Sequence, residues 1–169
     1  MAINTAQGGA GTVITDYDLW RLAGSISLAT NDVLSGSGTW ERPDNPTGGY
    51  VGSGVSLSGG SFTFPKTGLW HINMVGGGYI NGNVQFFGLV LDHTTNNYTN
   101  YTQLLMPYSN TAYNIGNPHT TVCSFCNLDV TDTTNQKVRL RTDTHGTFTW
   151  FGNTSGNMTA ISFMRFGDT

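Results

Sequence analysis

The side chains best suited to acid–base or metal chemistry in this chain are its histidines and a few closely spaced aspartates. The four histidines have no neighbours at the spacing of a catalytic or zinc motif, and we expect them to face solvent or the rim of the fold: His71, His93, His119 and His145. Carboxylates that could bind calcium or form a catalytic pair are Asp16, Asp18, Asp129, Asp132 and Asp143. Aspartate at turns more often makes a local hydrogen bond, so we expect no metal, no cofactor and no enzymatic activity.

Cys123 and Cys126 form a C-x-x-C pair in the stretch CSFC. A redox motif requires this pair at the start of a helix, and a zinc site requires two further ligands at matching spacing. Positions three apart on a strand point to opposite faces, which makes a mutual disulfide geometrically awkward. We therefore expect two reduced, mostly buried thiols that act as small hydrophobic side chains.

The composition indicates one all-β domain. A chain of 169 residues fits a single domain, and charged residues are 10% of it, where about 25% is usual. The net charge of −3 and the seven scattered basic residues leave no electrostatic footprint for nucleic acid. Because we identify neither an export signal nor an apolar run of membrane-spanning length, we expect synthesis in a host cytoplasm and no membrane partner.

The first 35 residues differ from the rest of the chain. Residues 1–16 are rich in glycine, alanine and threonine and lack periodicity, which predicts a terminal arm. A short helix over 16–23 is one possibility, and a strand is favoured from Gly24 onward. We therefore divide the chain into an arm with the first strand or short helix, 1–35, and a jelly-roll domain, 36–169.

The larger part of the chain consists of short alternating runs separated by turn signals. Glycine, proline, asparagine and aspartate predict a loop over 35–54, with Trp40 on a short edge strand. The stretch VGGGYINGN (75–83) predicts a turn, and it lacks the helix that must follow a phosphate-binding loop. Runs at intervals of about ten residues are typical of an antiparallel β-sandwich, here a jelly roll of about eight to ten strands.

Tyrosines lie among asparagine and threonine over 96–114, and three of them are candidates for a recognition surface: Tyr98, Tyr101 and Tyr108. Their rings could stack on sugars or face a partner. In a strand–loop–strand segment such rings also pack the sandwich or a subunit contact. Both interpretations stay open.

The stretch GSFTFPKTGLWHINM (60–74) resembles the trimeric jelly rolls that include the complement globular heads and the tumour-necrosis-factor-like cytokines. The positions that match their motif are Gly60, Phe62, Gly68, Trp70 and Ile72. The last stretch, AISFMRFGD (160–168), resembles the final strand of that family, with Phe163 and Phe166 in its aromatic places. A third stretch, NLDVTDTTNQKVRLRTD (127–143), resembles the strand–turn–strand of that family, but TNQK replaces the usual Gly-Asp turn. In the last stretch, Gly167 stands where proline is frequent.

The resemblance implies a sandwich that forms a homotrimer through a flat, aromatic-rich face. Candidates for that face, each of which could instead belong to the core, are Tyr113, Trp150, Phe151 and Phe166. The resemblance also implies that Gly60, Phe62, Gly68, Trp70, Ile72 and Phe163 shape the core.

The family's animal members are secreted or membrane-anchored and often carry disulfides, features that we do not find here. Viral and microbial relatives occur as fibre knobs and particle-surface proteins. The leading hypothesis is therefore a non-enzymatic virion structural protein that decorates or cements a phage capsid or fibre through its N-terminal arm. Its partner would be the major capsid protein or a tail or fibre protein, at the virion surface. The alternative is a receptor- or carbohydrate-binding fibre knob.

Overall fold

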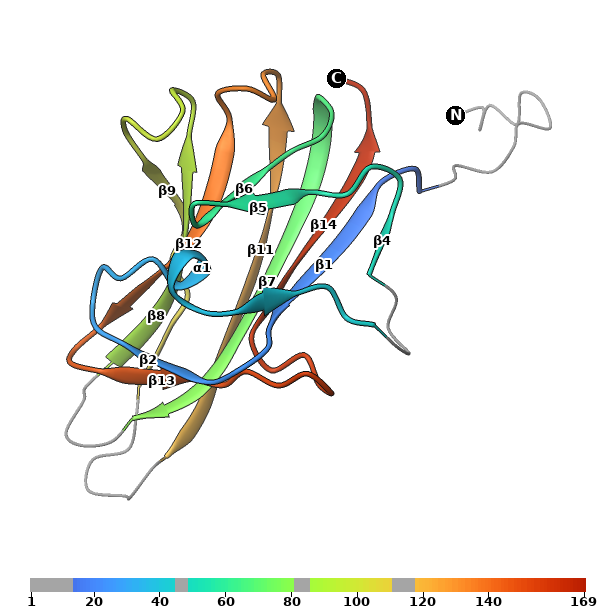
Figure 1. The fold of residues 1–169 in the computed structure, drawn as a ribbon. Coiled ribbons are helices and arrows are strands. Elements are labelled where there is room, and N and C mark those ends of the chain that lie inside the picture. Colours follow the sequence, from blue (N-terminus) through green and yellow to red (C-terminus); the bar gives the residue numbers. More distant parts are fainter. Residues whose placement is uncertain (1–13, 45–48, 81–85, 111–117) are drawn as a thin grey trace, which may run out of the picture.

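The computed structural model describes residues 14–44, 49–80, 86–110 and 118–169, which form two antiparallel sheets packed face to face (Figure 1). The larger sheet contains β1 (Tyr17–Leu22), β2 (Ile26–Leu28), β3 (Trp40–Glu41), β4 (Tyr50–Val51), β7 (Gly68–Ile80), β11 (His119–Val130), β13 (Phe148–Trp150) and β14 (Ala160–Gly167). The smaller sheet contains β5 (Ser56–Ser58), β6 (Ser61–Thr63), β8 (Phe86–Thr94), β9 (Thr102–Leu105), β10 (Tyr108–Asn110) and β12 (Lys137–Thr144). A short helix, α1 (Leu34–Ser37), lies beside β12.

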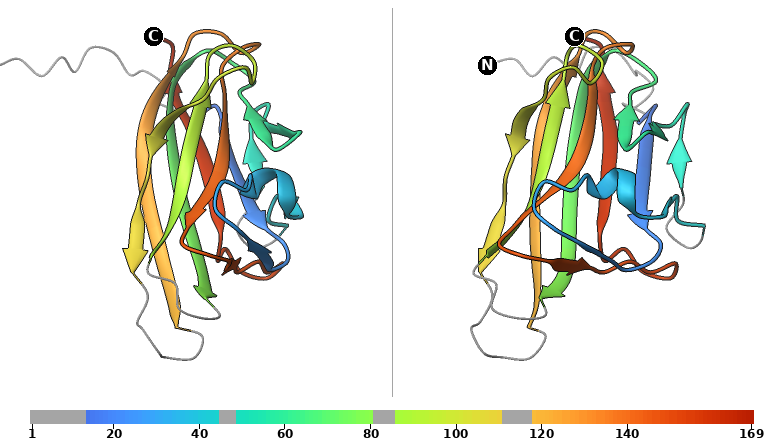
Figure 2. Two further views of the ribbon diagram at one scale, coloured as in Figure 1. Left: turned by 90° about the vertical axis from the view of Figure 1, so that its left-hand side faces the viewer. Right: turned by 60° about the vertical axis from the view of Figure 1, so that its left-hand side comes forward.

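The predicted antiparallel β-sandwich is confirmed, because the strands of both sheets pair antiparallel throughout the described ranges. Figure 2 shows the long strands running side by side along the molecule, with α1 and the β5–β6 hairpin to one side. The segment 35–54, predicted as a loop, contains most of α1 and the short strands β3 and β4, with Trp40 on β3 as expected. These short strands raise the strand number above the predicted eight to ten.

The helix considered for 16–23 is wrong, because this segment forms β1. Residues 17–21 pair with β14 along the whole strand, so that sheet pairing overrides the local helix signal. Fully buried Asp18 holds β1 to the following loop: it accepts hydrogen bonds from Arg42 Nε and Nη2, both at 2.9 Å, and from Val55 N at 2.5 Å. A buried carboxylate needs such partners, which gives Asp18 a structural role.

Asp16, just before β1, is also structural. Its carboxylate accepts hydrogen bonds from Lys66 Nζ at 2.9 and 3.0 Å and from Ser53 N. Burial acts to raise the pKa of Asp16, but the hydrogen bonds from Lys66, Thr15 and Ser53 outweigh it and leave this pKa below its ordinary value. The described chain therefore begins with two carboxylates that anchor the first strand.

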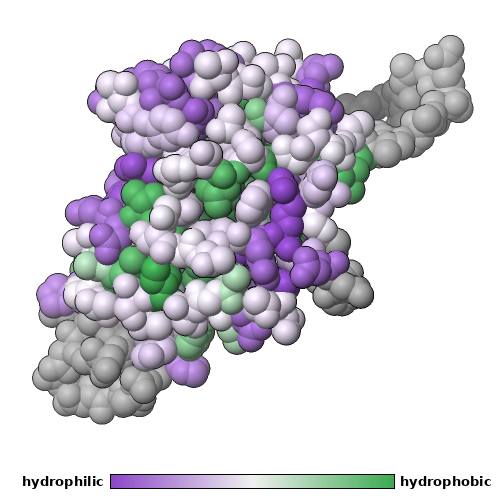
Figure 3. Space-filling view, in the orientation of Figure 1, coloured by the Kyte–Doolittle hydropathy of each residue, from purple (hydrophilic) through white to green (hydrophobic). Residues whose placement is uncertain are grey.

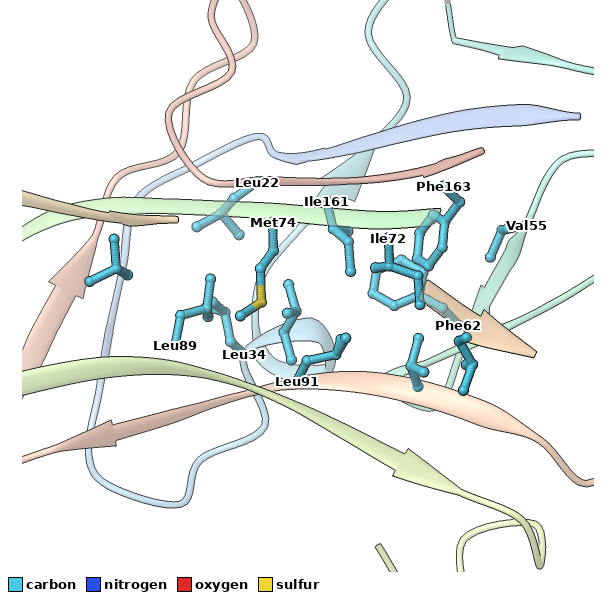
Figure 4. Packing of buried hydrophobic residues seen from close by; sticks show 14 of the residues in the cluster. Leu22, Leu34, Val55, Phe62, Ile72, Met74, Leu89, Leu91, Ile161 and Phe163 are labelled. Atoms are coloured by element: carbon cyan, nitrogen blue, oxygen red, sulfur yellow. The ribbon is translucent and has the colours of Figure 1, made fainter. Parts of the chain in front are cut away.

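The core lies between the two sheets. Four aromatic side chains, Phe62, Phe64, Trp70 and Phe163, are at most 1% exposed and pack with ring centroids 5.2–5.8 Å apart. Figure 4 shows Leu34 of α1 among buried aliphatic side chains of both sheets. Phe62, Trp70, Ile72 and Phe163 of the family-like motif are all fully buried, and Gly60 and Gly68 have φ of +80° and +123°, a conformation that favours glycine.

The glycine-rich stretch after Val75 is a strand, contrary to the predicted turn. β7 continues through Gly76, Gly77 and Gly78 to Ile80; Asn81 and Gly82 lie outside the described residues. A Cβ atom on Gly76 would lie 2.5 Å from the Trp150 ring, and one on Gly78 would lie 2.4 Å from the Phe148 ring. These glycines therefore let two large rings approach the strand backbone, which is a common reason for glycine inside a strand.

We expect Gly76→Ala to lower the free energy of unfolding by about 1–3 kcal/mol, because the added methyl overlaps the rigid Trp150 indole. Urea unfolding followed by tryptophan fluorescence measures the change. The matched control is Gly156→Ala, since a Cβ atom at Gly156 meets no other atom within 4 Å. Equal unfolding midpoints for the two variants would contradict the packing role of Gly76.

Candidate functional site

The outer face of the larger sheet, turned away from the core, carries an unusual concentration of apolar and aromatic side chains. On β7 the buried residues Trp70, Ile72 and Met74 alternate with outward ones, and the register of β11 and β14 continues this outer face across the sheet. The outward side chains on these three strands are Leu69, His71, Asn73, Val75, Tyr79, His119, Thr121, Cys123, Phe125, Asn127, Asp129, Ala160, Ser162 and Met164. We call this surface, with the adjoining Phe151, Met158 and Phe166, the β7–β11 face.

Two phenylalanines project from one end of the β7–β11 face. Phe125 is 66% exposed and Phe166 is 52% exposed, and the His71 ring lies between them with centroids 5.4 and 5.8 Å away. Asn127 Oδ1 lies 2.9 Å from His71 Nδ1 and so fixes the ring. Phe166 lies at an irregularity in the pairing of β14 with β7, between Arg165 and Gly167. Large apolar side chains are thus held rigidly in a solvent-exposed position.

The other end of the face is hollowed. A depression of about 400 Å³ is lined by Val75, Gly77, His119, Phe151 and Met158 among others, and the rings of Tyr79, His119 and Phe151 pack beside it at centroid distances of 4.9–6.0 Å. A second hollow of about 240 Å³ shares Val75 with the first. Gly77 contributes to the larger hollow because it places no side chain on this face.

The residues predicted for a subunit interface are divided by the structure. Phe151 and Phe166 lie on the β7–β11 face. Trp150 is fully buried and packs against Phe148 at a centroid distance of 4.6 Å, so it is a core residue. Its neighbour Phe151 points to the opposite side, as adjacent residues of an extended chain do. Tyr113 lies outside the described residues. Phe125, the most exposed aromatic side chain among the described residues, was not among the predicted candidates, although its position in the alternation of VCSFCNL could have indicated an outward ring.

The two cysteines are free thiols on opposite sides of β11. Cys126 is half-buried on the core side, where burial raises the pKa of its thiol. Cys123 is exposed on the β7–β11 face beside Val75, so the expectation of a buried thiol is wrong for Cys123. The prediction that the two thiols point apart agrees with their positions in the strand.

The three tyrosines predicted for recognition do not form one group. Tyr98 and Tyr101 lie together, with ring centroids 6.4 Å apart, near the end of β8 that Thr94 occupies. Tyr108 pairs with Gly88 at the other end of that strand, and its hydroxyl donates to Asp143 Oδ2 at 2.6 Å. Burial and this hydrogen bond raise the pKa of Tyr108 to about 12.

The titratable side chains are dispersed. His93 differs from the expected rim position, since it lies on the same side of β8 as the core residues Leu89 and Leu91, and burial lowers its pKa. Within the described residues, no three histidine, cysteine, aspartate or glutamate side chains are grouped closely enough to hold a metal ion. No helix in that part of the chain is long and apolar enough to cross a membrane.

The arrangement of strands is similar to solved structures of the tumour necrosis factor class. Eiger, a tumour necrosis factor from S. frugiperda, matches with a TM-score of 0.69 and 12% sequence identity, covering 90% of this chain and 93% of that chain. Murine APRIL matches with TM-scores of 0.61 at pH 5.0 and 0.59 at pH 8.5, with 10% and 11% identity, covering 89% of this chain and 98% of that chain in both cases. No protein-family model and no curated protein sequence matches. The fold is therefore a tumour-necrosis-factor-like jelly roll.

Proposed function

We propose that this protein is a non-enzymatic structural protein of a virus particle that assembles as a homotrimer through its β7–β11 face. The observation that carries the assembly is the combination, on one face, of projecting aromatic side chains and hollows. Exposed apolar surface of this kind marks a protein interface. The similarity of fold to tumour-necrosis-factor-like proteins favours other copies of the same chain as the partners that bind this face.

The layout of the β7–β11 face supports a ring. The projections, Phe125 and Phe166, and the hollow around Gly77 lie at different places on the face. A projection of one copy that enters a hollow of the next makes a heterologous contact, and such contacts close into a ring when the rotation between copies permits it. A trimer is the smallest ring of this type and leaves no copy with an uncovered face.

The proposed virion role rests on the composition of the chain and on its N-terminal arm. Charged residues make up 10% of the chain, and its surface polarity comes from hydroxyl and amide groups, which suits a protein assembled into a larger particle. The proposed attachment segment is the N-terminal arm, of which residues 1–13 lie outside the described residues. Three arms on one trimer gain avidity, so that weak individual contacts suffice.

A recognition function is the second candidate. The observation that favours it is a groove on the other sheet that contains Tyr98 and Tyr101. This groove shares no lining residue with the β7–β11 face, so a fibre knob could use both surfaces.

We expect the chain to have three times its monomer mass of 18.2 kDa in light scattering at micromolar concentration. Phe125→Glu replaces the projecting ring by a charge within the proposed interface, and we expect it to raise the dissociation constant about 30-fold or more. Met106→Glu is the control, because Met106 is 41% exposed in the β9–β10 connection, away from this face. A monomeric wild-type chain, or an unchanged trimer in Phe125→Glu, would refute this mode of assembly.

We expect Cys123 to be protected from maleimide in the assembled protein, although it is exposed in the single chain. A Cys126→Ala background leaves one thiol, and the labelling rate is measured by mass spectrometry. In the trimer Cys123 should react at least about tenfold more slowly than in the Phe125→Glu variant, because neighbouring copies cover it. Equal rates would place Cys123 outside the interface.

Deleting residues 1–13 should leave the fold and the oligomeric state unchanged, because Asp16 and its ion pair with Lys66 are retained. We expect the truncated trimer to lose co-sedimentation with virus particles from which the native protein has been removed. The full-length trimer is the positive control, and the same deletion in Phe125→Glu separates the loss of arms from the loss of avidity. Undiminished particle binding by the truncated trimer would refute attachment through the arm.

A further inference from the structure

A groove of about 920 Å³ lies between α1, the β5–β6 hairpin and the loop that joins β8 to β9. Its volume falls in the range of small-molecule sites, about 300–1,000 Å³. The exposed or half-buried residues that could contact a ligand are Ser37, Ser58, Tyr98, Tyr101 and Arg139. They come from the smaller sheet and its flanking segments, so the groove stays accessible when the β7–β11 face is covered.

The surface around the groove is not an apolar docking surface. Figure 3 presents the side of the molecule that carries α1 and the β5–β6 hairpin in Figure 1, and its hydrophobic residues form small separate patches among neutral and hydrophilic ones. Hydroxyl groups dominate the polar lining: serines line the groove from α1, β5 and β6. Such a lining suits a ligand that is itself rich in hydroxyl groups.

Among the described residues, Arg139 is the one charged side chain that lines the groove. Lys137, Arg139 and Arg141 lie on the outer side of β12, and the single buried carboxylate of Asp92 accepts hydrogen bonds from both arginines, at 3.1 Å from Arg139 Nε and 3.0 Å from Arg141 Nε. One carboxylate between two guanidinium groups leaves an excess positive charge. Among the described residues, Arg139 makes no hydrogen bond through its terminal nitrogens, and none of the groove's lining residues is acidic.

Tyr98 and Tyr101 are held in place beside this charge. Arg139 Cζ lies 3.5 Å from the centre of the Tyr101 ring, and Lys137 Nζ lies 4.3 Å from the centre of the Tyr98 ring. Tyr98 has a φ of +80°, and its backbone N–H donates to Thr94 Oγ1 at 3.3 Å. A left-handed conformation is costly for tyrosine, and such strain concentrates at binding sites.

The floor of the groove is made of backbone. Gly60 and Gly36 approach so closely that a Cβ atom on Gly60 would lie 2.9 Å from Gly36 Cα. The neighbouring Gly59, with a φ of +56°, has no atom within 4 Å of the place where its Cβ would lie. The exposed Gly59 therefore leaves space at this end of the groove, whereas the buried Gly60 packs against α1.

We propose that this groove binds an acidic saccharide, a ligand class that deepens the recognition function proposed above and rests on it. The saccharide carboxylate would pair with the free terminal nitrogens of Arg139, the planar fork that suits carboxylates. The apolar side of a sugar ring packs against Tyr98 and Tyr101. The exposed hydroxyls of Ser37 and Ser58 hydrogen-bond the sugar hydroxyls.

The test is a titration of the full-length trimer with two carboxylate-bearing probes, sialyllactose and a trisaccharide of galacturonic acid, and with lactose as the neutral comparison. We expect the better acidic probe to bind at least about tenfold more tightly than lactose, since one charged hydrogen bond contributes that much. Chemical shifts of groove residues in NMR spectra report the site, and calorimetry gives the dissociation constant. Binding of the acidic probe should weaken as salt rises.

Variants locate the binding in the groove. Arg139→Gln should remove the preference for the acidic probe while Arg141 keeps Asp92 paired, and Tyr101→Ala should weaken binding about tenfold. The matched controls are Arg165→Gln and Tyr108→Ala, whose side chains do not line the groove, and both should bind as the wild type does. Circular dichroism and light scattering verify that each variant is folded and assembled.

Three results would overturn the proposal. Equal affinity for lactose and the acidic probes would refute the acidic class and keep a recognition function at the groove. An unchanged preference in Arg139→Gln would refute the assigned site. The absence of binding by all three probes at millimolar concentration would remove saccharide recognition from this groove, without touching the proposed assembly through the β7–β11 face.

Discussion

The alternation of side chains along β7 is the constraint on which both faces of the larger sheet depend. This strand of 13 residues pairs with β11 on one edge and with β14 and β13 on the other. Its inward residues Trp70, Ile72 and Met74 are fully buried, and every outward residue contributes to the β7–β11 face. Because the period is two, a slip of one residue would exchange the core for the surface along the whole strand. The core packing of Trp70 and Ile72 therefore also fixes the place of His71 between the two exposed phenylalanines.

The same alternation decides which side of the sheet each of the three consecutive glycines of β7 leaves without a side chain. Gly76 and Gly78 face the core and admit the rings of Trp150 and Phe148, whereas Gly77 faces outward and leaves the larger hollow. One run of glycines thus tightens the core on one side of the sheet and shapes the surface on the other. Close packing of the interior and a depression outside arise from the same local sequence.

Features of the fold could be predicted from the sequence where contacts between residues close in the chain determine them, and could not where contacts between distant residues do. The strands and the buried aromatic residues near Phe62 and Trp70 could be predicted, because alternation within a few residues sets them. The glycine stretch was predicted as a turn, since its strand conformation depends on the rings of Phe148 and Trp150, which lie 70 and 74 residues after the glycines that they contact. Likewise the pairing of Tyr101 with Arg139 joins a loop to a distant strand, and no spacing in the sequence signals it.

The two candidate surfaces belong to different sheets of the sandwich, and this separation has an energetic consequence. The proposed assembly through the β7–β11 face would cover apolar surface and leave the groove between α1 and the β8–β9 loop open on each copy. A ring of three copies would then present three equivalent grooves at fixed spacing. Linked sites gain about 10²–10⁴ in apparent affinity when a ligand spans them. In the proposed ring, a single groove with the terminal nitrogens of Arg139 and two tyrosine rings would need to bind each sugar only weakly, because the proposed apolar contacts on the opposite sheet would supply the multivalency.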